Sequence, residues 1–229
     1  MIIGGYQGVS LIDYPGVIAS IIFLRGCNLM CPYCHNSELI PFEGDTVSEE
    51  EVFNHLVKNK NIIDGVCVTG GEPCLQPDLP EFLAKIKKLG FKIKLDTSGS
   101  EIDTLKTSLS KKLVDYVAMD IKHSFDKYGE IVRGKNYKEV VDSVRKAMDV
   151  LRSSGIDYEY RTTIWRGVHM EEDIMDIASI LKPKEKYFLQ DVKTEKTLVP
   201  IELGEGPSSK EIARAVKEKY PEIIISSRN

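Results

Sequence analysis

Short apolar runs in this chain alternate with longer segments whose apolar residues recur every three or four positions. Each run predicts a β-strand, and the runs lie at 17–25, 63–69, 91–96, 113–119, 157–164 and 186–190. The segments between them have the spacing of amphipathic helices. Alternating strands and helices are typical of an α/β fold with a largely parallel sheet. We therefore predict a partial (β/α)6 TIM-like barrel with a short C-terminal extension.

Residues typical of helix ends mark several of these helices. Ser48 with Glu51 predicts a capping box. Asp78 is expected to start the next helix, and Gly90 to end it. The apolar face expected for the first of these helices consists of Val52, Phe53, Leu56 and Val57. Further helices are expected at 137–154, 171–181 and 208–219, the last begun by Ser208 with Glu211.

The composition indicates a globular protein with charges of both signs. The chain has 229 residues, of which 42% are hydrophobic and 29% charged, so we expect a single domain over 1–229. The formal net charge of −4 gives no reason to expect nucleic-acid or membrane partners. The longest apolar stretch near the N-terminus, Val17–Leu24, is far too short to span a bilayer. A cytoplasmic location is therefore expected.

Three of the five cysteines lie together, at Cys27, Cys31 and Cys34. Thiolates are soft ligands for iron–sulfur clusters or zinc, and three on one loop leave a fourth ligand position open. An odd and crowded set does not favour a disulfide framework. A structural zinc site completed by His35 is the main alternative, but the sequence has no second cysteine pair. A thiol redox pair at Cys31 and Cys34 is a further alternative, although such a pair would not need a third neighbouring cysteine.

The Cys-x3-Cys-x2-Cys spacing, with Tyr33 before the last cysteine, resembles the signature of radical S-adenosylmethionine enzymes. Cys-Pro-Tyr-Cys-His-Asn at 31–36 resembles the version in activating enzymes of glycyl radical proteins, and Ser-Leu-Ile-Asp-Tyr-Pro-Gly at 10–16 is similar to their segment before the first strand. The resemblance is closest to activating proteins of anaerobic ribonucleoside-triphosphate reductase, with pyruvate formate-lyase activating enzyme a near relative. It covers about 13–190.

This resemblance implies a mechanism. Cys27, Cys31 and Cys34 would hold three irons of a [4Fe–4S] cluster, and S-adenosylmethionine would bind the fourth. One electron, from a flavodoxin or ferredoxin, would cleave S-adenosylmethionine to methionine and a 5′-deoxyadenosyl radical. That radical would abstract hydrogen from a glycine of a partner enzyme. A radical enzyme that modifies a small molecule remains an alternative within the same class.

Other polar groups fall at the ends of predicted strands, where barrel folds build active sites. Gly70-Gly71-Glu72 resembles the family motif that binds the methionine amino group, although an ordinary turn with a structural glutamate remains open. The resemblance implies a cofactor-binding set of Tyr33, His35, Gly70, Gly71, Glu72, Asp96, Ser98, Asp120, Lys122, Arg161 and Gln190.

Within that set, the resemblance implies particular roles. Asp96 and Asp120 would lie near the cofactor and hold a monovalent cation with Thr97. Lys122 would meet the methionine or ribose end of the cofactor. Arg161 would pair with the methionine carboxylate through its bidentate fork. Gln190 stands where related enzymes can carry a histidine, and would contact the ribose.

The remaining polar and aromatic residues are expected to be structural. Cys67 and Cys74 are expected to be buried, and His123 and His169 to be lone packing or surface histidines. Trp165 is expected to cap the barrel. Asp13 is expected either in a turn or against the partner, and 123–136 as a lid, a docking loop or a long connection.

Overall fold

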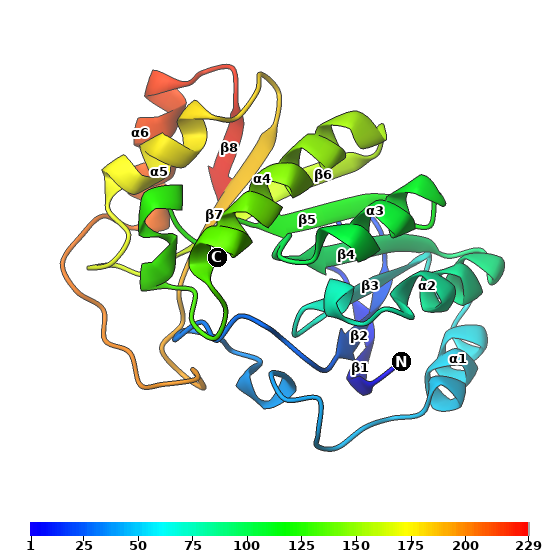
Figure 1. Ribbon diagram of the computed structural model, residues 1–229. Helices are drawn as coiled ribbons and strands as arrows, with labels where there is room; N and C mark the ends of the chain where they lie inside the picture. The colour runs from blue at the N-terminus through cyan, green and yellow to red at the C-terminus, as the bar shows by residue number, and fades with distance from the viewer. Residues whose placement is uncertain (229) are drawn as a thin grey trace. The chain divides into compact units, whose positions relative to one another are not determined.

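A computed structural model describes residues 1–228 and has the α/β architecture expected from the sequence (Figure 1). The strands are β1 (Ile3–Ser10), β2 (Ala19–Leu24), β3 (Gly65–Gly70), β4 (Lys92–Thr97), β5 (Tyr116–Asp120), β6 (Asp157–Ile164), β7 (Lys186–Asp191) and β8 (Ile224–Ser227). The α-helices are α1 (Glu49–Lys58), α2 (Leu79–Lys88), α3 (Ile102–Ser110), α4 (Tyr137–Ser154), α5 (Glu171–Ser179) and α6 (Ser209–Lys219). Short 3₁₀ helices are η1 (Ser37–Leu39), η2 (Pro73–Leu75) and η3 (Phe125–Glu130).

The six predicted strands are β2 to β7, and the prediction missed β1, β8 and α3. The β1 sequence is Ile-Gly-Gly-Tyr-Gln-Gly-Val-Ser, and glycine has low strand propensity, so no apolar run marks this strand. Strand β8 has only four residues. Helix α3 is rich in serine and threonine, which weakens the helical pattern. The region 123–136, expected as a lid, a docking loop or a long connection, contains η3.

The chain divides into two compact units. Unit one comprises 1–28, 38–118 and 143–157, and unit two comprises 29–37, 119–142 and 158–229. The prediction of a single domain over 1–229 stays a prediction. In the described part of the chain, no helix is both long and apolar enough to cross a membrane.

In unit one, strands that follow one another in sequence lie next to one another. Strand β1 is antiparallel to β2, whereas β2, β3 and β4 are parallel. Ile22 pairs with Val68, and Val66 with Ile93. Because all four side chains are buried, the register places the core on these strands. Helices α2 and α3 contact each other, and α2 contacts β4 (Figure 1).

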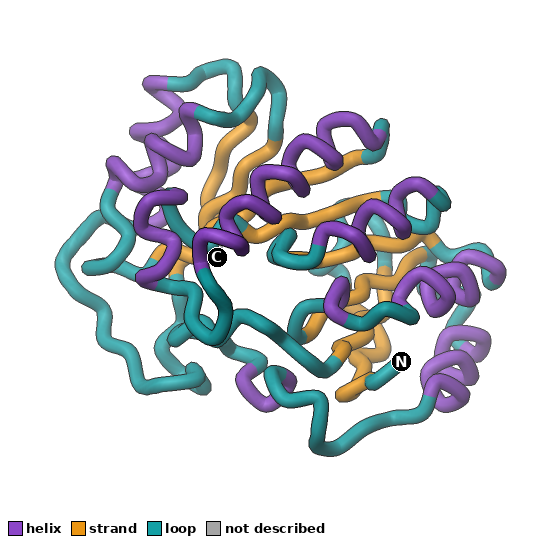
Figure 2. The backbone as a smooth tube through the Cα atoms, in the orientation of Figure 1, coloured by secondary structure: helices purple, strands orange, loops and turns teal. Residues whose placement is uncertain are grey.

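Unit two contains the parallel strands β6, β7 and β8. Helix α6 packs on β7 and β8 and also contacts α5 (Figure 1). After β7, the segment 192–208 forms no helix or strand (Figure 2). Arg228 follows β8 and donates to both carboxylate oxygens of the buried Glu159 at 2.6 and 2.8 Å. Its guanidinium lies 3.3 Å from the ring centroid of Phe188, so Arg228 ties the end of β8 to its neighbour β7 and, through Glu159, to β6.

The predicted helix ends are partly confirmed. Ser48 caps α1 by accepting the Glu51 amide at 3.1 Å, and Ser208 and Glu211 form a complete capping box at α6. Asp78 precedes α2, but its side chain pairs with the ammonium of Met1 at 2.8 Å instead of capping the helix. Val57 was expected on the apolar face of α1 and is 57% exposed, so that prediction was wrong.

Candidate functional site

The cysteine segment begins at the end of β2 and runs into unit two. Cys27 is half-buried in unit one, whereas Cys31 is buried and Cys34 half-buried in unit two. The Cys34 amide donates to the Cys31 carbonyl at 3.0 Å, which makes a tight turn between them. No three His, Cys, Asp or Glu side chains within 1–228 are gathered to hold a metal ion, so the cluster ligands stay a prediction. In type and sequence spacing, the three thiols fit an iron–sulfur centre.

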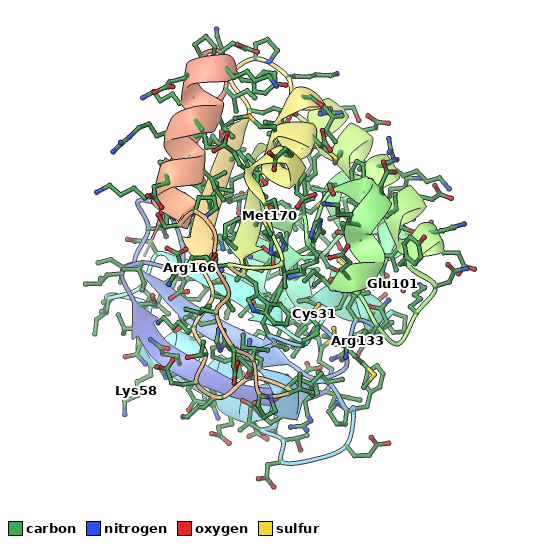
Figure 3. All side chains as sticks on the ribbon, turned by 90° about the vertical axis from the view of Figure 1, so that its left-hand side faces the viewer. Cys31, Lys58, Glu101, Arg133, Arg166 and Met170 are labelled. Carbon is green, nitrogen blue, oxygen red and sulfur yellow. The ribbon has the colours of Figure 1, made fainter. Side chains whose placement is uncertain are left out.

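Cys31 is buried, and the charge of Lys122 acts on its thiol. The Met30 amide donates to the Arg133 carbonyl at 2.9 Å, which holds this part of the segment near Arg133 (Figure 3). Burial raises the pKa of the Cys31 thiol to about 11, although the charge of Lys122 opposes that rise. In the metal-free protein Cys31 is therefore protonated at neutral pH, and a metal must displace its proton.

Tyr33 is buried beside Trp165. The two rings meet edge to face with centroids 6.4 Å apart. Burial raises the pKa of Tyr33 well above its usual value. Its hydroxyl has no hydrogen-bond partner among the described residues. A buried unpaired hydroxyl is unfavourable, and a bound molecule could supply the missing acceptor.

The segment 192–208 holds the cysteine loop from one side. The Val199 amide donates to the Pro32 carbonyl at 3.2 Å. His35 is exposed, and its Nδ1 lies 3.2 Å from the Glu195 carbonyl oxygen. Trp165, expected as a barrel cap, donates from its indole to the Glu202 carbonyl at 2.8 Å. The structure therefore gives His35 a contact with the chain and leaves its cofactor role a prediction.

Gly70 and Gly71 have no room for side chains. Gly70 has φ +121°, and a Cβ there would lie 2.3 Å from the Leu24 carbonyl oxygen. A Cβ on Gly71 would lie 2.2 Å from the Gly26 carbonyl oxygen. The Gly71 amide donates to Leu24 at 2.9 Å, and the next amide donates to Gly26 at 2.8 Å. Close backbone packing against the end of β2 therefore requires both glycines, whatever their contact with a cofactor.

Glu72 is 1% exposed and joins the ends of β3 and β4. Its carboxylate accepts hydrogen bonds from the Cys74 amide at 3.0 Å and the Thr97 hydroxyl at 2.7 Å. It also accepts from the amide and the hydroxyl of Ser98, at 2.7 and 2.5 Å. Four protein donors serve this carboxylate, which supports the structural alternative for Glu72. Contacts of Glu72 and Ser98 with a cofactor stay predictions.

Asp96 lies on the same face of β4 as Lys94, and the two side chains form an ion pair. The Lys94 side chain is 2% exposed and that of Asp96 15%. The Lys94 ammonium also lies 3.7 Å from the sulfur of Cys67. Cys67 and Cys74 are each 1% exposed, which confirms that they are buried. Sequence reasoning missed Lys94, because a strand lysine normally points to solvent.

Three predicted site residues of unit two meet at Asp120. One carboxylate oxygen accepts from Arg161 Nε at 2.8 Å, and the other from Lys122 Nζ at 2.9 Å. Burial opposes ionisation of Asp120, but the two cations outweigh it and hold the pKa of that carboxyl well below its usual range. Burial also lowers the pKa of Lys122, yet Asp120 and the neighbouring Tyr33 and Cys31 raise it further. The side chains of Asp120, Lys122 and Arg161 are therefore ionised throughout the physiological pH range.

Buried side chains hold the backbone that carries Lys122. The Thr162 hydroxyl donates to the Ile121 carbonyl at 2.7 Å. The Lys122 amide donates to the Tyr128 hydroxyl at 3.1 Å, and its carbonyl accepts from His169 Nε2 at 2.8 Å. Sequence reasoning missed these supporting residues because they come from three separate segments.

His123 and His169 are packing residues, which was one of the two alternatives expected, but they are not isolated from each other. The His169 ring stacks on that of His123 with centroids 4.5 Å apart, and both residues are fully buried. His169 Nδ1 accepts from the Trp165 amide at 3.0 Å, so the proton of the neutral ring lies on Nε2. Burial, with help from His123, lowers the pKa of His169 to about 4. His169 therefore links the Lys122 backbone to Trp165 as a neutral ring.

Two predicted residues have other contacts. Gln190 is exposed on β7, and its amide donates to the Thr163 hydroxyl at 2.8 Å. Its ribose contact stays a prediction. The Asp13 carboxylate accepts from the Ser10 hydroxyl, which fits the turn expected there.

Comparison with known proteins identifies the family of this chain. The Radical SAM superfamily model matches residues 21–179. A Methanocaldococcus jannaschii protein, named provisionally as a glycyl-radical enzyme activating enzyme, is 32% identical over 234 residues, covering 100% of this chain and 97% of its own length. The pyruvate formate-lyase-activating enzyme of Clostridium pasteurianum is 32% identical over 183 residues, covering 77% of this chain and 74% of its own.

Solved structures agree in fold. Streptococcus suis SuiB bound to precursor peptide SuiA has a TM-score of 0.66 at 14% identity, covering 91% of this chain and 48% of the other. The structure of anSMEcpe with bound S-adenosylmethionine has a TM-score of 0.63 at 19% identity, covering 90% of this chain and 61% of the other. These radical enzymes have partial TIM barrels, which confirms the predicted fold class. The chain belongs to the radical S-adenosylmethionine superfamily and, within it, to the glycyl-radical enzyme activating enzymes.

Proposed function

We propose that this enzyme activates an anaerobic ribonucleoside-triphosphate reductase by generating its glycyl radical. The family's [4Fe–4S] cluster and S-adenosylmethionine supply the reductive cleavage and the hydrogen abstraction when they are bound. The observation that carries the proposal is the ionised cluster of Asp120, Lys122 and Arg161, which shares unit two with Cys31. Full-length similarity to a protein provisionally named as a glycyl-radical activase supports it.

The residues of unit two have definable tasks in this proposal. Cys31 and Cys34, with Cys27, would be the cluster ligands. The charge of Lys122 favours the thiolate form of Cys31, which offsets part of the cost of ionising a buried thiol. The Asp120 carboxylate fixes the plane of the Arg161 guanidinium through Nε. A guanidinium held in this way is suited to bind the carboxylate of S-adenosylmethionine.

A pyruvate formate-lyase is the second candidate partner. The Clostridium pasteurianum enzyme, which is named for that activity, matches 77% of this chain at 32% identity. For the electron donor we propose a flavodoxin or ferredoxin, and for the location the cytoplasm.

The test begins with anaerobic reconstitution with iron and sulfide, then reduction with S-adenosylmethionine present. The reductase and a pyruvate formate-lyase are added in separate reactions, and electron paramagnetic resonance detects a glycyl radical on either. We expect 5′-deoxyadenosine and a radical on the reductase. A radical only on the lyase would replace the partner. Release of 5′-deoxyadenosine with no radical on either protein would exclude both partners and leave another glycyl radical enzyme or a small molecule as the substrate.

A cysteine pair provides the matched control. Cys31→Ala should abolish iron incorporation and S-adenosylmethionine cleavage together, whereas Cys74→Ala should keep both, because Cys74 is buried outside the loop. Cleavage by the Cys31→Ala variant would show that the cluster is bound elsewhere.

A further inference from the structure

The resemblance to activating enzymes implies a monovalent cation held by Asp96, Thr97 and Asp120, and the contacts that each of these residues makes inside its own unit do not fit that role. A monovalent cation needs several oxygen atoms whose lone pairs point toward it. Each of the three side chains already has partners inside the protein. Asp96 and Thr97 belong to unit one, and Asp120 belongs to unit two.

Lys94 neutralises Asp96. Its side chain is 2% exposed, and its ammonium contacts the Asp96 carboxylate directly. The two residues are separated by one position on β4, so they project from the same face of the strand. A buried ammonium is unfavourable unless a partner compensates its charge. The Lys94 ammonium therefore already pairs with the carboxylate that the implied cation would need.

Thr97 is engaged in a different network. Its hydroxyl donates to Glu72 at 2.7 Å and accepts from the Gly99 amide at 3.0 Å. The only proton of the hydroxyl is directed to Glu72, and one of its two lone pairs receives the amide. Asp120 has a cation on each carboxylate oxygen, Arg161 on one and Lys122 on the other. All three expected ligands thus have internal partners.

We propose that the ammonium of Lys94 is a built-in counter-ion for Asp96, and that this enzyme works without a bound monovalent cation. A tethered ammonium has a high effective concentration at its partner and does not depend on the ions in solution. The proposal deepens the proposed function and rests on it for the activity measurement. The unfolding measurement needs only the protein without its iron–sulfur cluster, so the counter-ion proposal and the proposed function can fail separately.

The first test measures thermal unfolding of the cluster-free protein in potassium, sodium, ammonium and choline chloride at equal ionic strength. A ligand that binds the folded state raises the unfolding midpoint, and choline is too large for such a site. We expect the same midpoint for the wild-type protein in all four salts. A higher midpoint in potassium or sodium than in choline would overturn the proposal.

Substitution of Lys94 gives the complementary test. In Lys94→Ala, the lost side chain leaves space beside Asp96, and small cations should recover about 2–4 °C of the midpoint lost in choline. In the control Lys94→Ala/Asp96→Asn, which lacks the carboxylate, the recovery should disappear. Equal recovery in both variants would show that the cations act elsewhere. If Lys94→Ala does not fold, Lys94→Met, which keeps the length of the side chain, replaces it in the same comparison.

The second test uses the reconstituted enzyme. Wild-type 5′-deoxyadenosine formation should be equal in potassium and in choline, whereas Lys94→Ala should be several-fold more active in potassium or ammonium. A wild-type enzyme that requires potassium would overturn the counter-ion proposal and leave the radical activity intact. Absence of 5′-deoxyadenosine in every salt would contradict the proposed function, and the midpoints would still decide the role of Lys94.

Discussion

Acidification should destabilise unit two through the buried ring of His169. An unfolded histidine has a pKa near 6.5, whereas burial lowers the folded pKa of His169 to about 4. The unfolded state therefore binds a proton more readily, so the contribution is complete above pH 6.5 and is lost as the pH falls toward 4. A difference of about 2.5 pKa units corresponds to about 3 kcal/mol of unfolding free energy.

The groups around His169 limit the pH range of this effect. His123, stacked on it, also has a lowered pKa through burial and adds stability lost in the same direction. Asp173 has a pKa below its usual value, because its bonds with Lys127 and the Met170 amide outweigh burial, so its contribution is lost only at lower pH. The ammonium groups of Lys127 and Lys122 keep their charge throughout.

The assay is urea unfolding of the cluster-free protein, followed by circular dichroism at several pH values between 7.5 and 4. In His169→Gln, the slope of the unfolding free energy against pH should correspond to the uptake of about one proton fewer on unfolding than in the wild-type protein. The exposed His35 provides the matched variant, His35→Gln, which should keep the wild-type dependence. If His169→Gln shows the wild-type dependence as well, the fold does not hold His169 neutral.

Two further predictions concern the charged groups. Arg161→Ala should weaken S-adenosylmethionine binding about 10–100-fold in anaerobic titrations while iron content is unchanged, because a charge-assisted contact is lost; equal loss of both would assign Arg161 a folding role. Glu72→Gln should lower the unfolding free energy by about 3 kcal/mol, because an amide nitrogen would face donors that now meet a carboxylate. Glu51→Gln on the exposed face of α1 is the control. Equal unfolding midpoints for the two variants would contradict the structural role of Glu72.

The sequence predicts the parts of this fold that depend on local patterns. Strands β2 to β7 are marked by apolar runs, and α6 by Ser208 and Glu211 at its start. Strand β1 has no such mark, because its glycines do not alternate with apolar residues. In the sequence Lys94 looks like a surface residue, because it stands two positions after Lys92 and so shares the same face of the strand. The structure does expose Lys92. Only tertiary packing buries Lys94 beside Cys67.

The candidate site shows the same division. Spacing and resemblance identify the cysteine loop and the polar strand ends, and the structure joins Asp120, Lys122 and Arg161. Their support by Tyr128 and His169 could not be predicted, because each contact joins residues on separate elements. A buried polar residue carries no distinctive local pattern, so its partner is visible only in three dimensions.

The packing of Gly70 and Gly71 bears on how this motif can be used to assign function. Any side chain at either position would collide with the backbone at the end of β2. Selection for folding alone would therefore preserve both glycines, and the bonds of Glu72 would preserve the third residue. A descendant that had lost its cofactor would still carry Gly-Gly-Glu. In a distant relative, the motif would thus record common ancestry of the fold, and activity would have to be inferred from the cysteines.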